Sequence, residues 1–543
     1  MRLSGNIVDL VKRTIFPGHI TVVDGQITAI EPTTDAVPSH YIMPGFVDSH
    51  VHVESSMLIP SEFARLAVVH GTVATVSDPH EIGNVLGVKG VRYMIDNGKK
   101  VPFNFFFGAP SCVPATTFET AGAAIGVDEI EELFTKNHLI YLSEMMNYPG
   151  VLARDPLVMD KIQAAKNHNL RVDGHAPGLR GKDAENYIAA GITTDHECYM
   201  LDEAEGKILL GMKVIIREGS AAKNYEALHP LIGTYPDKLM FCSDDKHPND
   251  LVDGHIDQLV KRSIIDEGYD LFDVLRIASY NPVKHYTLDV GLLQVGDPLD
   301  CIIVDNLEDF TVLETYIKGL RVAEKGKTLI QSVPSDIVNN FAISEKKEEE
   351  FVIPNNGNTI QVIVAEDGQL ITKKLVTHAK IDGNQLVADV ERDILKLVVV
   401  NRYKEAPVAA CFVQGFGLKE GALASCIAHD SHNIIAVGVD DASITAGVNA
   451  LIKNKGGIAT AVGAKIDVLP LPIAGIMSHE DGYKVAAEYT AIDKRAKALG
   501  STLHAPFMTL SFMALLVIPS LKLSDLGLFD GESFTFTKNN FTL

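Results

Sequence analysis

Short apolar runs alternate with amphipathic segments through the central part of the chain, residues 44–289. The amphipathic segments have helical spacing, and most end near Gly, Asn or His, as helices tend to do. The apolar runs predict eight strands, at residues 46–53, 71–77, 103–108, 139–143, 170–174, 192–195, 214–217 and 239–243. Eight strand and helix units in succession predict an α/β fold with a closed (β/α)8 barrel of the TIM type.

The segments on either side of this central part are rich in predicted strands. Residues 1–43 contain short strands, and the Asp24-Gly25 pair between two apolar runs is a strong hairpin signal. Residues 290–340 carry a similar pattern with Gly and Asp turns. We therefore expect the two flanks, 1–43 and 290–340, to pair into one small sandwich-like β-sheet domain around a barrel at 44–289.

The remaining third of the chain predicts a separate domain. The charge run at residues 344–351, SEKKEEEF, is typical of a solvated linker or an exposed helix. Beyond it, alternating apolar runs and helical patterns predict a C-terminal α/β domain over 345–543. Its HDSHN motif (429–433) has two interpretations: a loop that closes over the barrel and excludes water, or a polar turn ahead of a strand.

Composition and charge narrow the class of protein. The 543 residues are 46% hydrophobic and 22% charged, which is ordinary for a globular protein. A net charge of -22 argues against a nucleic-acid partner and favours a small neutral substrate. Six irregularly spaced cysteines predict reduced thiols and a cytoplasmic protein. The N-terminus lacks the pattern of a secretory signal, and the apolar run at 505–519 is too short for a membrane span, so we expect no membrane partner.

Potential metal ligands follow the predicted strands at regular places. These donors are His50 and His52 at the first strand, Glu144 after the fourth, His175 after the fifth, His196 after the sixth and Asp244 after the eighth. A single strand-terminal His or carboxylate more often packs or caps a helix. Because the carboxyl ends of barrel strands share one rim, the joint occurrence of six donors predicts a metal centre there.

Six nitrogen and oxygen donors are too many for one tetrahedral zinc but suit two divalent ions that share a bridging ligand. Glu144 has two oxygens and can span the two ions. Because the set contains no thiolate, manganese, iron and zinc all stay open. Two such ions lower the pKa of a bound water towards ~7 and present hydroxide to an electrophilic carbon. Asp244 would then take the proton and pass it to the leaving group.

Six motifs carry a resemblance to a known family. They are HVHVESSM (50–57), VSDPHEIGNV (76–85), FGAPSCVPATTFE (107–119), REGSAAKN (217–224), CSDDKHP (242–248) and HDSHN (429–433). With them the chain resembles the amidohydrolase superfamily, and within it a purine-deaminating branch. The resemblance implies hydrolysis of adenine to hypoxanthine and ammonia, in purine salvage and adenine catabolism, at a binuclear centre of manganese or iron. It also implies that Glu144 bridges the ions where many relatives carry a carboxylated lysine.

Further residues of these motifs are candidates for catalysis. Asp78 and His80 follow the second strand, and we expect one of them to contact the leaving amine or to orient a ligand; the alternative is a structural turn set by Pro79. Glu54 is expected to orient a histidine or to protonate a ring nitrogen, with a plain surface carboxylate as the alternative.

The substrate pocket is expected from loops at the same rim. Ser111 and Cys112 follow the third strand, and Arg217 and Ser220 follow the seventh, so these residues are predicted to shape a purine site. An apolar turn is the alternative for Cys112. Asp245 is a further candidate. In the alternative assignment, Asp245 and not Asp244 takes the proton and passes it to the leaving group.

Two other functions stay open at this point. One is a related hydrolase that acts on a cyclic amide, as hydantoinases and dihydroorotases do, since one barrel supports many reactions. The other is a barrel scaffold without activity, which should have lost some of the donors. The expected partner is a small purine, in a homo-oligomer of two or more chains.

Overall fold

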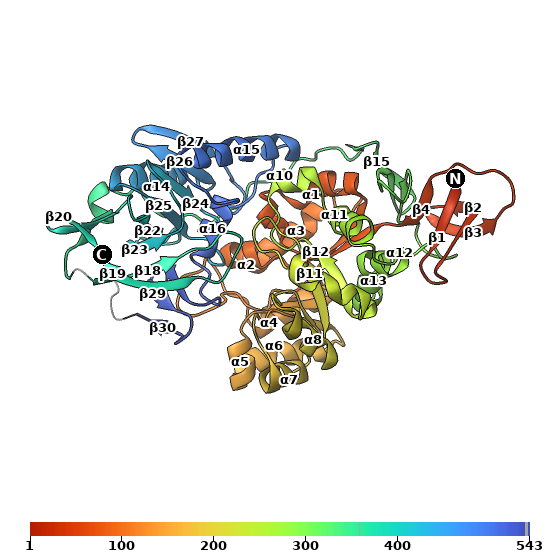
Figure 1. Cartoon of the computed structure of the whole chain (residues 1–543), viewed down its shortest axis with the longest axis horizontal. Coiled ribbons are helices and arrows are strands. Elements are labelled where there is room, and N and C mark those ends of the chain that lie inside the picture. Colours follow the sequence, from red (N-terminus) through yellow and green to blue (C-terminus); the bar gives the residue numbers. More distant parts are fainter. Residues whose placement is uncertain (358, 538–540, 543) are drawn as a thin grey trace.

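The computed structural model describes residues 1–357, 359–537 and 541–542. Figure 1 shows an elongated α/β molecule whose N-terminal strands lie at one end and whose C-terminal sheet lies at the other. A segment of alternating strands and helices lies between them. Among the described residues, no helix is both long and apolar enough to span a membrane.

Eight parallel strands form a closed ring in the middle of the molecule. They are β5 (Phe46–Val51), β6 (Thr72–Ser77), β7 (Asn104–Phe107), β8 (Tyr141–Met145), β9 (Arg171–Gly174), β10 (Thr194–Asp195), β11 (Lys213–Arg217) and β12 (Leu239–Cys242). Five neighbouring pairs are regular parallel ladders. Single parallel bridges, Ala109 to Leu142, Val172 to Ile192 and Val51 to Asp244, join the remaining neighbours and close the ring.

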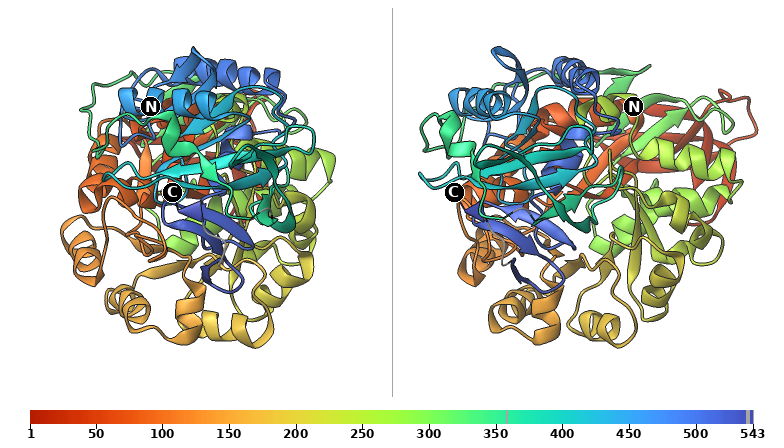
Figure 2. Two further views of the ribbon diagram at one scale, coloured as in Figure 1. Left: turned by 90° about the vertical axis from the view of Figure 1, so that its left-hand side faces the viewer. Right: turned by 60° about the vertical axis from the view of Figure 1, so that its left-hand side comes forward.

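Helices connect and cover the strands of this ring. The principal ones are α1 (Pro60–Ala67), α2 (His80–Leu86), α3 (Val88–Gly98), α4 (Val127–Lys136), α5 (Tyr148–Ala153), α6 (Pro156–Asn167), α7 (Gly181–Ala189), α8 (Leu201–Leu209), α10 (Pro248–Asp253), α11 (Ile256–Lys261), α12 (Leu271–Leu275) and α13 (Asn281–Tyr286). Helices α4 to α8 gather at the bottom of Figures 1 and 2. All residues of β5, β6 and β12 are buried, as expected for parallel strands covered on both faces.

The two flanks of the ring segment share one sheet. Its order is β16-β15-β14-β13-β4-β1-β2-β3, built from β1 (Arg2–Asp9), β2 (Thr14–Val23), β3 (Gln26–Pro32), β4 (Tyr41–Pro44), β13 (Cys301–Val304), β14 (Val312–Ile317), β15 (Leu320–Glu324) and β16 (Lys327–Thr328). The predicted hairpin turn joins β2 and β3, with φ of 50° at Asp24 and 80° at Gly25. Glycine is required at position 25 because a Cβ there would collide with the Lys318 carbonyl.

The C-terminal part is a mixed α/β layer. Its sheet runs β19-β18-β23-β22-β25-β24-β26-β27, and β31 pairs with β23. The bounds are β18 (Thr359–Val364), β19 (Lys373–His378), β22 (Ile394–Val400), β23 (Ala409–Gln414), β24 (Ala422–Ser425), β25 (Ile434–Gly438), β26 (Ile458–Val462), β27 (Lys465–Leu469) and β31 (Phe541–Thr542), with helices α14 (Asp441–Asn454) and α15 (Gly482–Ala498). The charge run before this layer forms a short 3-10 turn at Glu348–Phe351.

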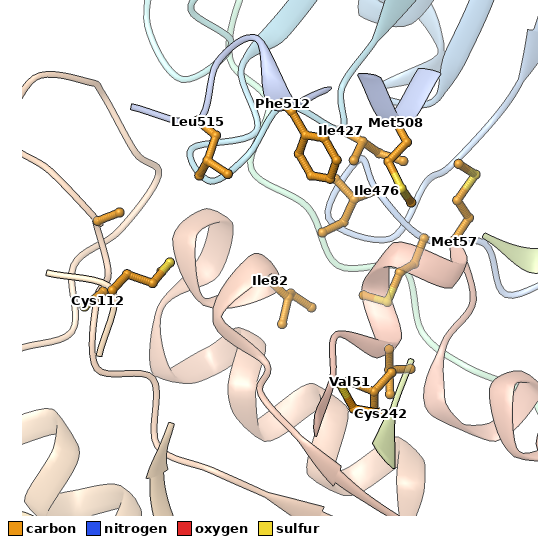
Figure 3. Close-up of a cluster of buried hydrophobic side chains, with 14 of the residues drawn as sticks. Val51, Met57, Ile82, Cys112, Cys242, Ile427, Ile476, Met508, Phe512 and Leu515 are labelled. Atoms are coloured by element: carbon orange, nitrogen blue, oxygen red, sulfur yellow. The ribbon is translucent and has the colours of Figure 1, made fainter. Parts of the chain in front are cut away.

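One hydrophobic cluster joins the C-terminal layer to the ring. Helix α16 (Pro506–Phe512), within the apolar run that is too short for a membrane span, is buried along its whole length. Figure 3 shows Met508, Phe512 and Leu515 on one side of the cluster and Ile82 and Met57 of the ring segment on the other. The C-terminal layer therefore covers one end of the ring.

Candidate metal centre and active site

His50 and His52 lie at the end of β5 and aim at one point. Their Nε2 atoms are 3.2 Å apart. Strand β5 ends at Val51, two residues earlier than predicted, because the chain turns into a 3-10 helix at Val53–Ser56, where the Ser55 amide donates to the His52 carbonyl. The Nδ1 of His52 lies 3.1 Å from the Asp78 carbonyl oxygen, so Nδ1 carries the proton and the Nε2 lone pair is left for a cation.

Glu144, in β8, places one carboxylate oxygen against each pair of histidines. Oε1 is 3.1 Å from Nε2 of His52, whereas Oε2 is 2.6 Å from Nδ1 of His175 and 3.3 Å from Nε2 of His196. Burial opposes ionisation of Glu144, but His175 and His196 hold its pKa well below the ordinary value. This is the arrangement expected of a carboxylate that bridges two cations.

Asp244 completes the cluster from the loop after β12. Its Oδ1 lies 3.4 Å from Nε2 of His50 and 3.2 Å from Nε2 of His52. The structure thus brings all six predicted ligands together. They are buried, and two sets of three, His50 with His196 and Asp244, and Glu144 with His175 and His196, have donor atoms within 4.8 Å of one another. Converging imidazole nitrogens and carboxylates in a buried site fit divalent cations with N and O ligands.

Arg217, at the end of β11, neutralises the outer side of this cluster. Its guanidinium donates 2.6 Å to Oδ2 of Asp244 and binds both oxygens of Glu197, one of them at 3.0 Å. All three side chains are buried. The two carboxylates more than offset the desolvation of the guanidinium, and the pKa of Arg217 is raised. In the structure, Arg217 therefore binds Asp244 directly. Its contact with substrate stays a prediction.

His80 lies between two carboxylates at the start of α2. Its Nδ1 is 3.1 Å from Oδ2 of Asp78, and its Nε2 is 3.7 Å from Oδ1 of Asp430 in the C-terminal layer. Burial lowers the pKa of His80, but the Asp78 carboxylate overcomes this and the pKa lies well above the ordinary value. The same ring faces Oε1 of Glu144 at 3.6 Å, so His80 adjoins the cluster.

Glu54 is a buried carboxyl group, which excludes the surface alternative. Its Oε1 accepts a hydrogen bond from the Ile82 amide at 3.2 Å, and its Oε2 has no hydrogen-bond partner among the described residues. Burial and the nearby Glu81 carboxylate raise the pKa of Glu54 to about 7. A carboxyl group of this kind exchanges a proton near neutral pH.

The predicted pocket residues do not line one cavity together. Asp245 lines the cavity above the cluster, where it accepts a 2.5 Å hydrogen bond from Ser55. Ser111 and Cys112 line a neighbouring cavity instead, and Ser111 donates 2.5 Å to the Glu144 carbonyl. Ser220 accepts a hydrogen bond from the His247 amide and binds the Asp250 carboxylate. The purine contacts of Ser111, Cys112 and Ser220 stay predictions.

Three functional candidates were not singled out from the sequence. Glu197 directly follows the ligand His196, and Glu81 directly follows His80, so adjacency to a motif residue was the available signal. Glu81 binds His429 Nδ1 at 2.6 Å and also His432 Nε2. Asp430 is the third, and its place beside His80 depends on how the C-terminal layer packs.

The cavity above the cluster is narrow, with a volume of about 20 Å³, room for little more than one water molecule. Five of the six predicted ligands form one wall: His52, Glu144, His175, His196 and Asp244. The C-terminal layer supplies Leu370, His429, Asp430, Phe512 and Leu515, and Figure 3 shows Phe512 and Leu515 on the side facing the ring. The HDSHN motif is thus a polar turn ahead of β25 (Ile434–Gly438) that also lies over the ring, and the closing of this loop to exclude water stays a prediction.

The sequence is similar to known proteins over its whole length. The amidohydrolase family matches residues 41–322, and the adenine deaminase C-terminal domain matches residues 369–535. Adenine deaminase of Sulfurovum sp. (strain NBC37-1) is 57% identical over 537 residues, with 99% of each chain covered. Adenine deaminase of Salinibacter ruber is 55% identical, with 98% of each chain covered. The solved beta-aspartyl dipeptidase of Fervidobacterium islandicum AW-1 is 14% identical, with a TM-score of 0.45, and covers 62% of this chain and 100% of its own.

Proposed function

The chain belongs to the adenine deaminase family of the amidohydrolases, and on that basis we propose how its residues deaminate adenine. The enzyme is a hydrolase that converts adenine and water to hypoxanthine and ammonia. We propose that the reaction takes place at two divalent cations held by His50, His52, Glu144, His175, His196 and Asp244. The observation that carries this proposal is the position of Glu144, with one oxygen towards each pair of histidines.

The donor set favours particular metals. Imidazoles and carboxylates without a thiolate suit manganese, iron or zinc, and family membership favours manganese or iron. When bound, the two cations supply acidified water as the nucleophile for the carbon that bears the amino group. The carbonyl of Asp78 fixes the tautomer of His52, and Arg217 holds Oδ2 of Asp244, so both ligands are oriented before a cation arrives.

The proton transfers are assigned to Asp244 and His80, which line the cavity, and to Glu54. Oδ1 of Asp244 faces the cluster while Oδ2 is occupied by Arg217, so we assign to Oδ1 the proton released by the attacking water. His80, held in its charged form beside Asp78, contacts the leaving amine. Glu54, with a pKa of about 7, passes a proton towards a ring nitrogen. Asp245 lines the cavity and is the alternative to Asp244.

We extend the proposal to the architecture. The strand ring at 44–289 is interpreted as the (β/α)8 barrel of the metal-dependent hydrolases, with 1–43 and 290–340 as the flanking sheet domain and 345–543 as the C-terminal domain. The closed parallel pairing of β5 to β12 supports this interpretation. In barrels of this type the active site lies at the carboxyl ends of the strands, where the six ligands are found.

Location and assembly are further parts of the proposal. All six cysteines, each within the described ranges, are free thiols, which supports a cytoplasmic enzyme. Exposed apolar side chains around α8, among them Met200, Leu201 and Leu209, support a homo-oligomer. Sedimentation of the purified protein tests the second point, and a monomer at assay concentration would contradict it.

A metal assay with a substrate panel tests the central proposal. Protein loaded with manganese or with iron should release ammonia from adenine in equal amounts with hypoxanthine. Dihydropyrimidines and hydantoins, the cyclic amides of the alternative function, should stay intact. Opening of those rings without ammonia release from adenine would refute the proposal, and so would full activity after complete metal removal.

A further inference from the structure

Four of the five side chains in residues 429–433 make a hydrogen bond or an ion pair of 2.9 Å or shorter. His429 and His432 both bind the Glu81 carboxylate. Ser431 donates a 2.5 Å hydrogen bond to the Glu119 carboxylate of the ring segment. Asn433 donates a 2.9 Å hydrogen bond to the Thr120 carbonyl. The loop of the C-terminal layer is therefore held on the ring segment through four side chains, so the loss of the Ser431 hydrogen bond alone leaves the other three in place.

Asp430, the fifth residue, is the exception. It is 3% exposed, and its Oδ2 has no hydrogen-bond partner among the described residues. Its Oδ1 faces two histidines at ion-pair distance, 3.7 Å from Nε2 of His80 and 3.9 Å from Nδ1 of His429, both beyond hydrogen-bond distance. An unpartnered buried carboxylate oxygen carries a large desolvation cost. A donor from the substrate would remove that cost.

Each of the other carboxylates that line the cavity has a partner closer than the 3.7 Å contact of Asp430. Glu144 and Asp244 belong to the ligand cluster, and both oxygens of Glu197 are bound by Arg217. Both oxygens of Glu81 face histidines. Asp245 accepts from Ser55. Asp430 is thus the lining carboxylate that is best placed to accept a new hydrogen bond.

The position of Asp430 also fits one end of a purine. His80 faces Glu144 with Nδ1 and Asp430 with Nε2, so Asp430 lies one imidazole ring beyond the ligand cluster. In adenine, the carbon that reacts is in the six-membered ring, and the ring N–H is in the fused five-membered ring. A purine whose amino-bearing carbon lies at the cluster can therefore reach Asp430 with its N–H in one of its orientations.

We propose that Asp430 accepts a hydrogen bond from the five-membered-ring N–H of adenine and so makes the C-terminal domain a determinant of specificity for the free base. This inference rests on the proposed function. A base substituted at that nitrogen has no hydrogen to donate and leaves the carboxylate unpaired. Sites built to bind a polar hydrogen reject analogues that lack it strongly, because the buried partner is left unsatisfied.

Matched pairs of analogues test the inference without a change of size. 7-Deazaadenine and furo[2,3-d]pyrimidin-4-amine differ in the N9–H, which is an oxygen in the second compound. 9-Deazaadenine and furo[3,2-d]pyrimidin-4-amine differ likewise at N7. Inhibition constants against adenine would be measured for all four with the metal-loaded enzyme. One pair should differ by about 10- to 100-fold in the unsubstituted enzyme, as expected for a hydrogen bond to a charged group.

Variants of Asp430 test whether this residue causes the difference in inhibition constants. Asp430→Ala should bring the ratio of the two inhibition constants in that pair to within about threefold of one. Asp430→Asn, which keeps the shape and one acceptor, should leave an intermediate ratio. Ser431→Ala is the matched control, because it alters the same loop without facing the cavity, and it should keep the full ratio. Circular dichroism and metal content of each variant would be recorded, and Asp430→Asn decides the test if the alanine variant does not fold.

Clear outcomes would overturn the inference. They are equal inhibition by both members of each pair in the unsubstituted enzyme, an unchanged ratio in the Asp430 variants, or an equal loss of the ratio in Ser431→Ala. The unsubstituted enzyme also separates this inference from the proposed function. Failure to release ammonia from adenine refutes the function, whereas normal deamination with an unaffected ratio refutes only the role of Asp430.

Discussion

Replacing Arg217 by methionine should leave two buried carboxylates without their counter-ion. The guanidinium lies between Glu197 and Asp244, with hydrogen bonds to both, and all three groups are at most 5% exposed. Methionine preserves much of the side-chain length but supplies neither charge nor donor. In the absence of cations, Glu197 and Asp244 would have to be protonated, hydrated or displaced.

Breaking a buried ion pair in this way costs about 3–5 kcal/mol. For a domain the size of the ring segment, this corresponds to a fall in the thermal midpoint of roughly 6–20 °C. We expect the full fall in chelator-treated protein, measured by calorimetry. Metal-loaded protein should lose less, because bound cations neutralise Asp244. The difference between the two preparations thus reports how close Arg217 lies to the metal centre.

A double-mutant cycle separates the charge effect from lost packing. Glu197→Gln combined with Arg217→Met removes one unpaired charge, so the double variant should regain about 1–2 kcal/mol over Arg217→Met alone. Arg217→Lys keeps the charge but loses the planar guanidinium with its paired donors, so its stability should lie between those of the unsubstituted protein and Arg217→Met. A loss below about 1 kcal/mol in Arg217→Met, or a double variant no more stable than the single one, would refute the reasoning.

Three further predictions concern the metals and pH. Glu144→Gln should reduce metal content and lower adenine turnover by at least about 100-fold, since it removes the bridging charge; a variant with full metal content and full turnover would contradict its role. Chelation should abolish ammonia release and lower the thermal midpoint, and manganese or iron should restore both; restoration by neither metal would argue against the centre. Burial and Asp430 raise the pKa of Glu119 to about 8 from an ordinary 4.5, so the folded state binds this proton more tightly. Stability should therefore fall by about 5 kcal/mol between pH 4.5 and 8, and Glu119→Gln should flatten this fall in unfolding midpoints; parallel pH profiles would contradict the assignment.

The strand-end ligands could be predicted from the sequence because parallel strands place their carboxyl ends at one rim. His50, His52, Glu144, His175 and His196 each follow an apolar run by a few residues, and the structure brings them together with Asp244. The hairpin at Asp24-Gly25 was predictable for a similar reason, since local backbone preference decides it.

Contacts between distant segments could not be predicted in this way. The bonds of Glu81 to His429 and His432 depend on how two layers pack, and no local pattern encodes that packing. Ser111 was expected at the purine site from its place after a strand. In the structure its hydroxyl turns back to the Glu144 carbonyl, because a buried hydroxyl must find a partner.

The shared flanking sheet has a consequence for synthesis on the ribosome. Met43 of β4 is paired with Ile302 of β13, so a large part of the chain must emerge before this edge of β4 is covered. Until then the nascent N-terminal strands present open backbone groups to other chains. A message truncated before β13 would therefore yield a product prone to edge-to-edge association, and chaperones that bind nascent chains should be recruited during this interval.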